Sequence, residues 1–167
     1  MSHGQMHLNS PRNSLVLAYL TRSLRRNTAT LAMVVRPEEL DDPYTTLGAH
    51  PEVVQRIWDE IGKALPEDCR SVIHSTPVLL HPGSGTIFVL AMGTGYGLRL
   101  PPPLVEAAIM RGARISVQYT YGGDLNAHRD LGSDWVLGAW LADETKWCIK
   151  AFEYFGQLGD AEPEGSP

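Results

Sequence analysis

The apolar side chains of two segments recur at the spacing of an amphipathic helix. In residues 12–35 the apolar positions fall within an arc about 100° wide, and the arginines fall on the opposite side. Polar residues around Asn27 weaken this helix, so a helix ending near Asn27 and a following strand to Val35 form the alternative. Residues 51–65 show a cleaner apolar face, with a proline in the first turn and another just past the end. The pattern therefore predicts a helix in each segment.

Beyond this second helix the apolar spacing changes to the two-residue period of a strand. Short strands are predicted at residues 71–74, 77–81, 86–92, 98–100 and 114–121, with a short helix at 101–111. The turn cluster Pro82-Gly83-Ser84-Gly85 predicts a hairpin between the second and third of these strands. Residues 125–133 are polar and are predicted to form a loop.

The last predicted helix, residues 140–155, is apolar around about 220° of its circumference. Trp140, Trp147 and Tyr154 recur every seven residues and form a ridge beside the main apolar face. A helix of this kind is either sunk into the core or covered on two sides by different partners. Core packing and an exposed interaction surface are therefore both open interpretations of the ridge.

This order of elements predicts an α+β fold. We expect an antiparallel sheet of about four to six strands, with the helices packed mainly on one face. At 167 residues, 43% of them apolar, the chain is long enough to bury one core. Residues 11–155 are predicted to form that single domain. Residues 1–10 and the acidic residues 156–167 are expected to be flexible tails, because they bury too little apolar surface to offset the entropy of ordering.

Charge is distributed unevenly along a chain whose formal net charge is −5. Residues 1–36 contain five arginines and no acid, whereas residues 37–167 contain nine bases against 19 acids. Arg22, Arg25 and Arg26 share the polar face of the first helix and are candidates for contact with a partner. Nucleic acid is not the expected partner, since domains that bind phosphate backbones usually carry a net positive charge.

Several features indicate a cytoplasmic protein. The longest mostly apolar stretch, Leu31–Val35, is far shorter than the roughly 20 residues of a membrane span, so no membrane association is expected. The N-terminus lacks the apolar core of a signal peptide. Cys69 and Cys148 are predicted to be free, buried thiols. The excess of arginine over lysine suggests a bacterial source with a GC-rich genome.

Residues able to support catalysis are scattered along the chain. If the protein is an enzyme, its pocket would combine side chains brought together by the sheet: His74, His81, Tyr96, Arg99 and His128. None of them lies in a recognisable catalytic motif, and the spacing of Cys69, His74 and His81 matches no compact zinc site. We therefore assign no catalytic residue, metal or cofactor from the sequence.

A binding protein is the function that these observations favour. An acidic body would steer toward a basic partner, and neutralisation of a basic toxin by an immunity-type protein is one concrete form. The candidate interaction residues are Trp140, Trp147, Tyr154, Arg22, Arg25 and Arg26. Two alternatives are an enzyme with the scattered site described above and a homo-oligomeric structural protein, such as a homodimer, that uses the same ridge.

Overall fold

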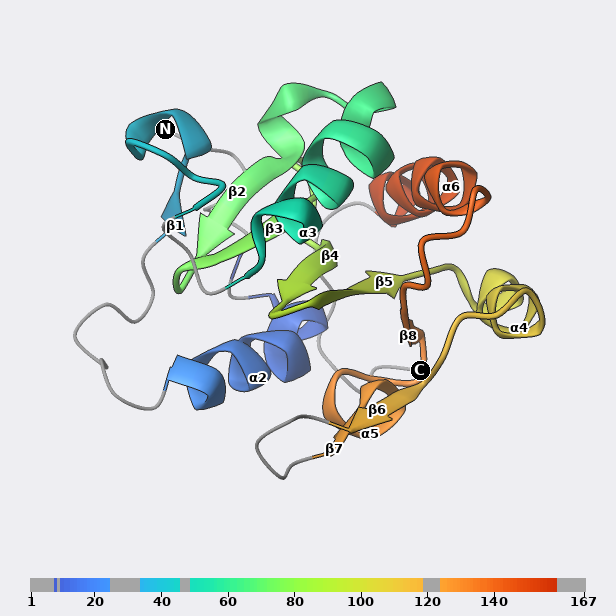
Figure 1. The fold of residues 1–167 in the computed structure, drawn as a ribbon. Coiled ribbons are helices and arrows are strands. Elements are labelled where there is room, and N and C mark those ends of the chain that lie inside the picture. The colour runs from blue at the N-terminus through green and yellow to red at the C-terminus, as the bar shows by residue number, and fades with distance from the viewer. Residues whose placement is uncertain (1–7, 9, 25–33, 46–48, 119–123, 159–167) are drawn as a thin grey trace.

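A computed structural model describes residues 8, 10–24, 34–45, 49–118 and 124–158 of the chain. Within them an antiparallel sheet of six strands has the order β1-β2-β3-β4-β5-β8 (Figure 1). The strands are β1 Val34–Val35, β2 Arg70–Ile73, β3 Thr76–Leu80, β4 Ile87–Met92, β5 Gly95–Arg99 and β8 Trp135–Leu137. A separate small sheet pairs β6 Ser116–Gln118 with β7 Asp124–Asn126. The predicted α+β class is confirmed.

Tight hairpins build the centre of the sheet. Strands β2 and β3 are joined by His74 and Ser75, whose φ angles of 49° and 64° are those of a hairpin turn with two left-handed residues. Strands β3 and β4 flank the predicted turn at residues 82–85. All six residues of β4 are buried, because this central strand has apolar layers on both faces.

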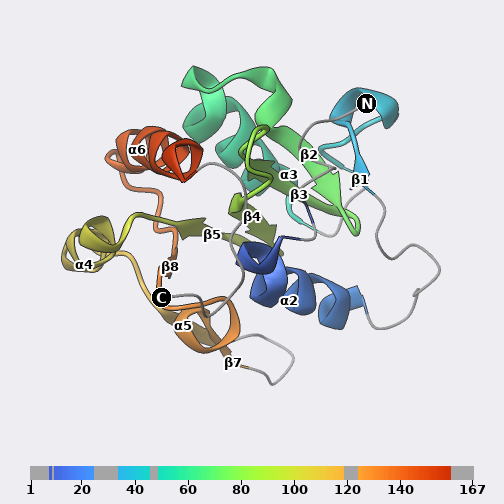
Figure 2. The same cartoon turned by 180° about the vertical axis from the view of Figure 1, so that it is seen from behind.

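Helical segments cover the two faces of the sheet unequally (Figures 1 and 2). The larger core cluster lies on the side of α3 Pro51–Gln55 and α6 Glu144–Gln157, where it includes Trp58, Phe88 and Phe155. The sequence predicts helices mainly on one face of the sheet, and this face corresponds to that prediction. A smaller cluster with Leu20 and Trp135 lies on the opposite face, under α2 Ser14–Leu24 and α5 Ala127–Asp130. Helix α4 Pro102–Met110 follows β5 beside the sheet.

The helix predicted at residues 51–65 changes its pitch twice. After α3 it continues as a π-helical turn, Arg56–Glu60, and then as a 3₁₀ turn, Ile61–Ala64. A Cβ on Gly62 would lie only 2.8 Å from the carbonyl oxygen of Ile57, so glycine allows the backbone to pass closely there. The π turn carries Arg56, whose side chain reaches Glu144 at the start of α6.

A buried asparagine fastens the N-terminal segment to the sheet. Asn13 ends the short 3₁₀ helix Pro11–Asn13, and its Nδ2 donates to the carbonyl oxygens of Leu8 (2.9 Å) and Gly85 (2.8 Å). Its Oδ1 accepts from the backbone N–H of Ile87 at 3.0 Å. Leu8 and Ser10, within the predicted N-terminal tail, are both buried; residues 1–7 and 9 lie outside the described part.

The structure corrects two predicted elements. The polar segment 125–133 is not a simple loop, since it contains the end of β7 and the whole of α5. Leu125, Ala127 and Leu131 are buried there, and the Asn126 side chain caps α5 by accepting from the backbone N–H of Arg129. The last helix begins at Glu144 rather than at residue 140, and it continues to Gln157.

Other predictions lie partly outside the described residues. The structure describes helix α2 as far as Leu24 and a strand at Val34–Val35, and this strand agrees with the second interpretation of residues 12–35. Residues 25–33 and the end of the predicted acidic tail, residues 159–167, are not among those described. No helix in the described ranges is both long and apolar enough to span a membrane.

Candidate functional site

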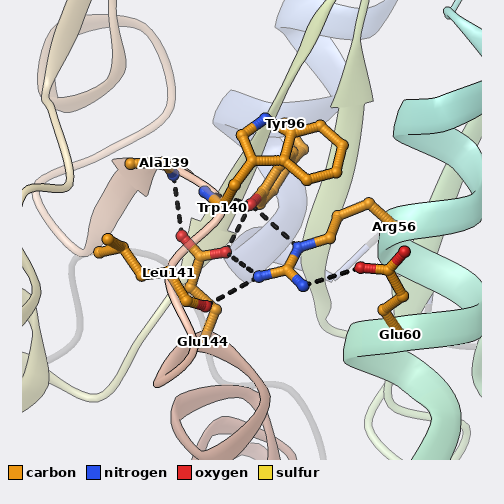
Figure 3. Close-up of polar contacts among 7 residues, drawn as sticks. All are labelled: Arg56, Glu60, Tyr96, Ala139, Trp140, Leu141 and Glu144. Atoms are coloured by element: carbon orange, nitrogen blue, oxygen red, sulfur yellow. Dashed lines mark hydrogen bonds and ion pairs between the residues drawn. The ribbon is translucent and has the colours of Figure 1, made fainter.

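A wholly buried carboxylate lies at the start of α6 (Figure 3). Glu144 has no exposed surface, and its Oε1 accepts from Nη2 of Arg56 at 2.7 Å and from the hydroxyl of Tyr96. Its Oε2 accepts from the backbone N–H of Ala139 at 2.8 Å. The first turn of a helix also favours negative charge. The Glu144 carboxylate is thus held by three protein donors.

Arg56 connects this carboxylate to the rest of the cluster. Its Nη1 binds Glu60 at 2.9 Å, and its Nη2 also donates to the carbonyl oxygen of Leu141 at 2.8 Å. Burial alone lowers the pKa of Arg56, but hydrogen bonds to Glu144, Tyr96 and Glu60 more than offset this effect and raise it. Arg56 is therefore a permanent cation shared between two carboxylates. The π turn that presents it is a distortion often found at functional sites.

Tyr96 stands at the centre of the cluster. Its oxygen accepts from Nε of Arg56 at 3.2 Å and from the backbone N–H of Trp140 at 2.8 Å, while its hydroxyl donates to Glu144. A Cβ on Gly138 would lie 1.9 Å from the tyrosine ring, so only glycine allows the ring to sit there. Burial raises the pKa of Tyr96, which keeps the phenol protonated as a donor.

Trp140 is the aromatic part of the cluster that reaches the surface. Its side chain is 48% exposed, and its indole contacts Tyr96 edge-on, with the ring centroids 5.3 Å apart. The guanidinium carbon of Arg56 lies 5.5 Å from the indole centroid. The backbone of Trp140 has a φ of 60°, a left-handed conformation that costs about 1 kcal/mol or more for a non-glycine residue. The hydrogen bond from its backbone N–H to Tyr96 supports this backbone conformation.

The cluster supports the loop 138–143 through hydrogen bonds to its backbone. Three backbone groups of this loop, at Ala139, Trp140 and Leu141, are bonded to buried side chains (Figure 3). The Glu144 oxygens accept from protein donors, and the side chain is wholly buried. One cation and two carboxylates leave the cluster of Arg56, Glu60 and Glu144 with a charge of −1.

The structure breaks up the predicted aromatic ridge. Because α6 begins at Glu144, Trp140 lies in the preceding loop and not on the helix. Trp147 is buried in the larger core, and Tyr154 is half-buried against that core. The three aromatic residues thus occupy two positions at the core and one separate position at the surface. The side chain of Arg22, and the whole of Arg25 and Arg26, lie outside the described residues.

Four of the five pocket candidates lie away from the cluster that contains Tyr96. His74 is in the turn between β2 and β3, and His128 is on α5. His81 follows β3 and stacks on Phe152 of α6, with ring centroids 4.6 Å apart. The structure brings none of these histidines to the Glu144 cluster.

Arg99, the remaining pocket candidate, and His81 make local contacts, whereas His128 is partly unsatisfied. Arg99 pairs with Asp134 at 2.7 Å. Nδ1 of His81 accepts from the backbone N–H groups of Gly83 and Ser84, and burial lowers its pKa, which keeps it a neutral acceptor. Nε2 of His128 is buried with no hydrogen-bond partner in the described part of the chain.

The described ranges contain neither a metal-binding group of side chains nor an exposed thiol. No group of three or more His, Cys, Asp or Glu side chains in them is arranged to hold a metal ion. Cys69 and Cys148 are both free and buried, as the sequence predicts. Burial raises the pKa of the Cys69 thiol to about 12, so its reactive thiolate is scarce near neutral pH.

A shallow hollow of about 430 Å³ lies over the small β6–β7 sheet, lined by polar side chains that include Arg114 and Arg129. Arg129 is already paired with Asp130 at 2.8 Å, and its Nη2 also donates to the carbonyl oxygen of Asp124. Asp124 in the lining and Asp130, which pairs with Arg129 from outside it, balance the two arginines. The hollow therefore lacks the net charge that would point to an ionic ligand.

Sequence reasoning did not identify Arg56 or Glu144 as site residues. Two local signals were present. Arg56 and Glu60 have the i, i+4 spacing of a helical ion pair, and Glu144 interrupts the wide apolar arc of the last helix. Their contact joins positions 88 residues apart, which no local pattern can show.

Comparisons of the chain with protein-family models, with curated proteins and with solved structures found no match.

Proposed function

We propose that this protein acts by binding another protein through a surface centred on Trp140. The observation that carries the proposal is the half-exposed indole, held in a left-handed backbone conformation by a buried network of charged groups. Tryptophan is enriched among residues that dominate binding energy at protein interfaces. Its large surface gives much contact area for little loss of side-chain freedom.

The buried charges support a positioning role for the network. Removing Arg56 and Glu144 from water costs free energy, and apolar residues of the same volume often stabilise a protein equally well or better. A polar network, however, fixes one loop conformation through directional hydrogen bonds. An indole fixed in advance loses less freedom on association, which favours affinity.

The charge of the chain favours a basic partner. Residues 37–167, which contain the whole Trp140 site, carry ten more acidic than basic side chains. The whole chain has a formal net charge of −5, and a net negative charge attracts a basic protein and speeds its encounter. An immunity-type protein that neutralises a basic toxin in the bacterial cytoplasm is the concrete form we propose.

Partner capture from a native cell lysate tests the proposal when two matched variants are compared. Trp140→Ala removes the exposed indole. Leu15→Ala, the control, removes an apolar side chain that is 47% exposed on α2, on the opposite face of the sheet. Loss of a central interface tryptophan costs about 2 kcal/mol or more. We therefore expect a partner captured by wild type and Leu15→Ala to bind Trp140→Ala at least about 30-fold more weakly.

Equal capture by both variants would overturn the proposal. The mass of the purified chain in solution distinguishes binding to another protein from self-association. A stable dimer that dissociates in Trp140→Ala would instead assign this surface to the homo-oligomeric alternative.

A further inference from the structure

We infer that the Trp140 surface receives an arginine or lysine side chain of the partner, which stacks on the indole and pairs with Glu60. This inference rests on the proposed binding function and adds the chemistry of the contact. It comes from the unequal burial of the two carboxylates that share Arg56.

The excess negative charge of the cluster is located at the surface. The Glu144 side chain is wholly buried and bonded to Arg56, whereas the Glu60 side chain is 50% exposed. Since Arg56 supplies one positive charge to both carboxylates, one negative charge remains, and only Glu60 offers it to solvent. A cation approaching from outside therefore meets Glu60.

Neighbouring arginines do not neutralise the negative charge of Glu60, because they pair with other carboxylates. Arg70 is paired with Asp59 at 3.2 Å, and Arg111 is paired with Asp143 at 2.8 Å. In the described part of the chain Glu60 pairs with Arg56 and not with the nearby Lys63. The position next to Glu60 is thus open to a cation from another molecule.

The indole supplies the second half of the contact. Arg56 already lies over the Trp140 ring, and the arginine is bonded in turn to Glu60 (Figure 3). This chain of contacts places the exposed indole and the exposed carboxylate beside the same guanidinium. Tryptophan is the side chain that best attracts a cation to its ring face. A partner's guanidinium or ammonium group could therefore contact both the indole and Glu60.

A peptide titration followed by NMR tests the inference without the natural partner. The probe is a short peptide with two arginines, compared with the same peptide in which neutral citrulline replaces arginine. The indole N–H signal of Trp140, identified by its absence in Trp140→Phe, reports binding. Signals from the buried Trp58, Trp135 and Trp147 report that each variant is folded.

We expect the arginine peptide to shift the Trp140 signal and the citrulline peptide to shift it much less. Glu60→Gln should weaken arginine-peptide binding about two- to fivefold, as for loss of an exposed ion pair. Glu67→Gln, which removes an exposed carboxylate elsewhere, should leave binding unchanged.

Equal shifts with both peptides, no shift with either, or wild-type binding by Glu60→Gln would each overturn the inference. The proposed function would then still be judged separately, by whether capture of the natural partner depends on Trp140.

Discussion

Asn13 and Glu144 are wholly buried polar residues on opposite faces of the sheet, and they have different roles. Asn13 is neutral, and its three hydrogen bonds all go to backbone groups, which fasten one segment of chain to one turn. Glu144 is charged and joins the π turn, strand β5 and the loop 138–143. Only the second cluster ends in a half-exposed aromatic side chain, that of Trp140.

This difference shows what each cluster contributes. A neutral amide can satisfy buried backbone groups at modest desolvation cost, so the Asn13 contacts are explained by folding alone. The charges around Glu144 cost more to bury, and their bonds converge on a loop with strained backbone at Trp140. We therefore interpret the Asn13 cluster as structural and the Glu144 cluster as a support for the binding surface.

The largest expected loss of stability comes from removing the buried charge of Glu144. Glu144→Ala leaves Arg56 buried with only the exposed Glu60 as an ionic partner, and this should lower the free energy of unfolding by about 3–5 kcal/mol. Urea unfolding followed by the fluorescence of the buried tryptophans measures the change. Glu67→Ala, at an exposed carboxylate, should change it by less than about 0.5 kcal/mol. A loss below about 1 kcal/mol in Glu144→Ala would show that Arg56 does not depend on Glu144.

A smaller loss of stability is expected from removing the neutral side chain of Asn13. Asn13→Ala leaves the carbonyl oxygens of Leu8 and Gly85 and the N–H of Ile87 without their side-chain partner. Unsatisfied buried groups of this kind cost about 1–3 kcal/mol, so the free energy of unfolding should fall by that amount. The same urea experiment measures it. Should Asn13→Ala destabilise the protein more than Glu144→Ala, the distinction between a neutral and a charged cluster would fail.

The regular part of the fold could be predicted from the sequence because its signals are local. The apolar face of residues 51–65, the two-residue period of the strands and the turn residues at 82–85 all act within one or two turns of chain. Helix α5 could not be predicted because the buried positions in and beside it, Ala127 and Leu131, are few and lie in a polar segment.

The candidate site could be predicted only in part. The aromatic spacing drew attention to Trp140, but it placed this residue on a helix. Hydrogen bonds from Tyr96 and Glu144 to the backbone of residues 139–140 accompany a different conformation there. Arg56 and Glu144 meet through the packing of α6 beside the π turn, and that packing is a property of the whole fold.

The most direct test of the account compares partner affinity in Tyr96→Phe and Asn13→Ala. Both changes remove buried hydrogen bonds, but only Tyr96 accepts the backbone N–H of Trp140, and its side chain is too deeply buried to touch a partner. We predict that Tyr96→Phe weakens binding of the captured partner about tenfold, or about 1.4 kcal/mol, whereas folded Asn13→Ala binds like wild type. Wild-type affinity in Tyr96→Phe would contradict the claim that the buried network positions Trp140 for binding.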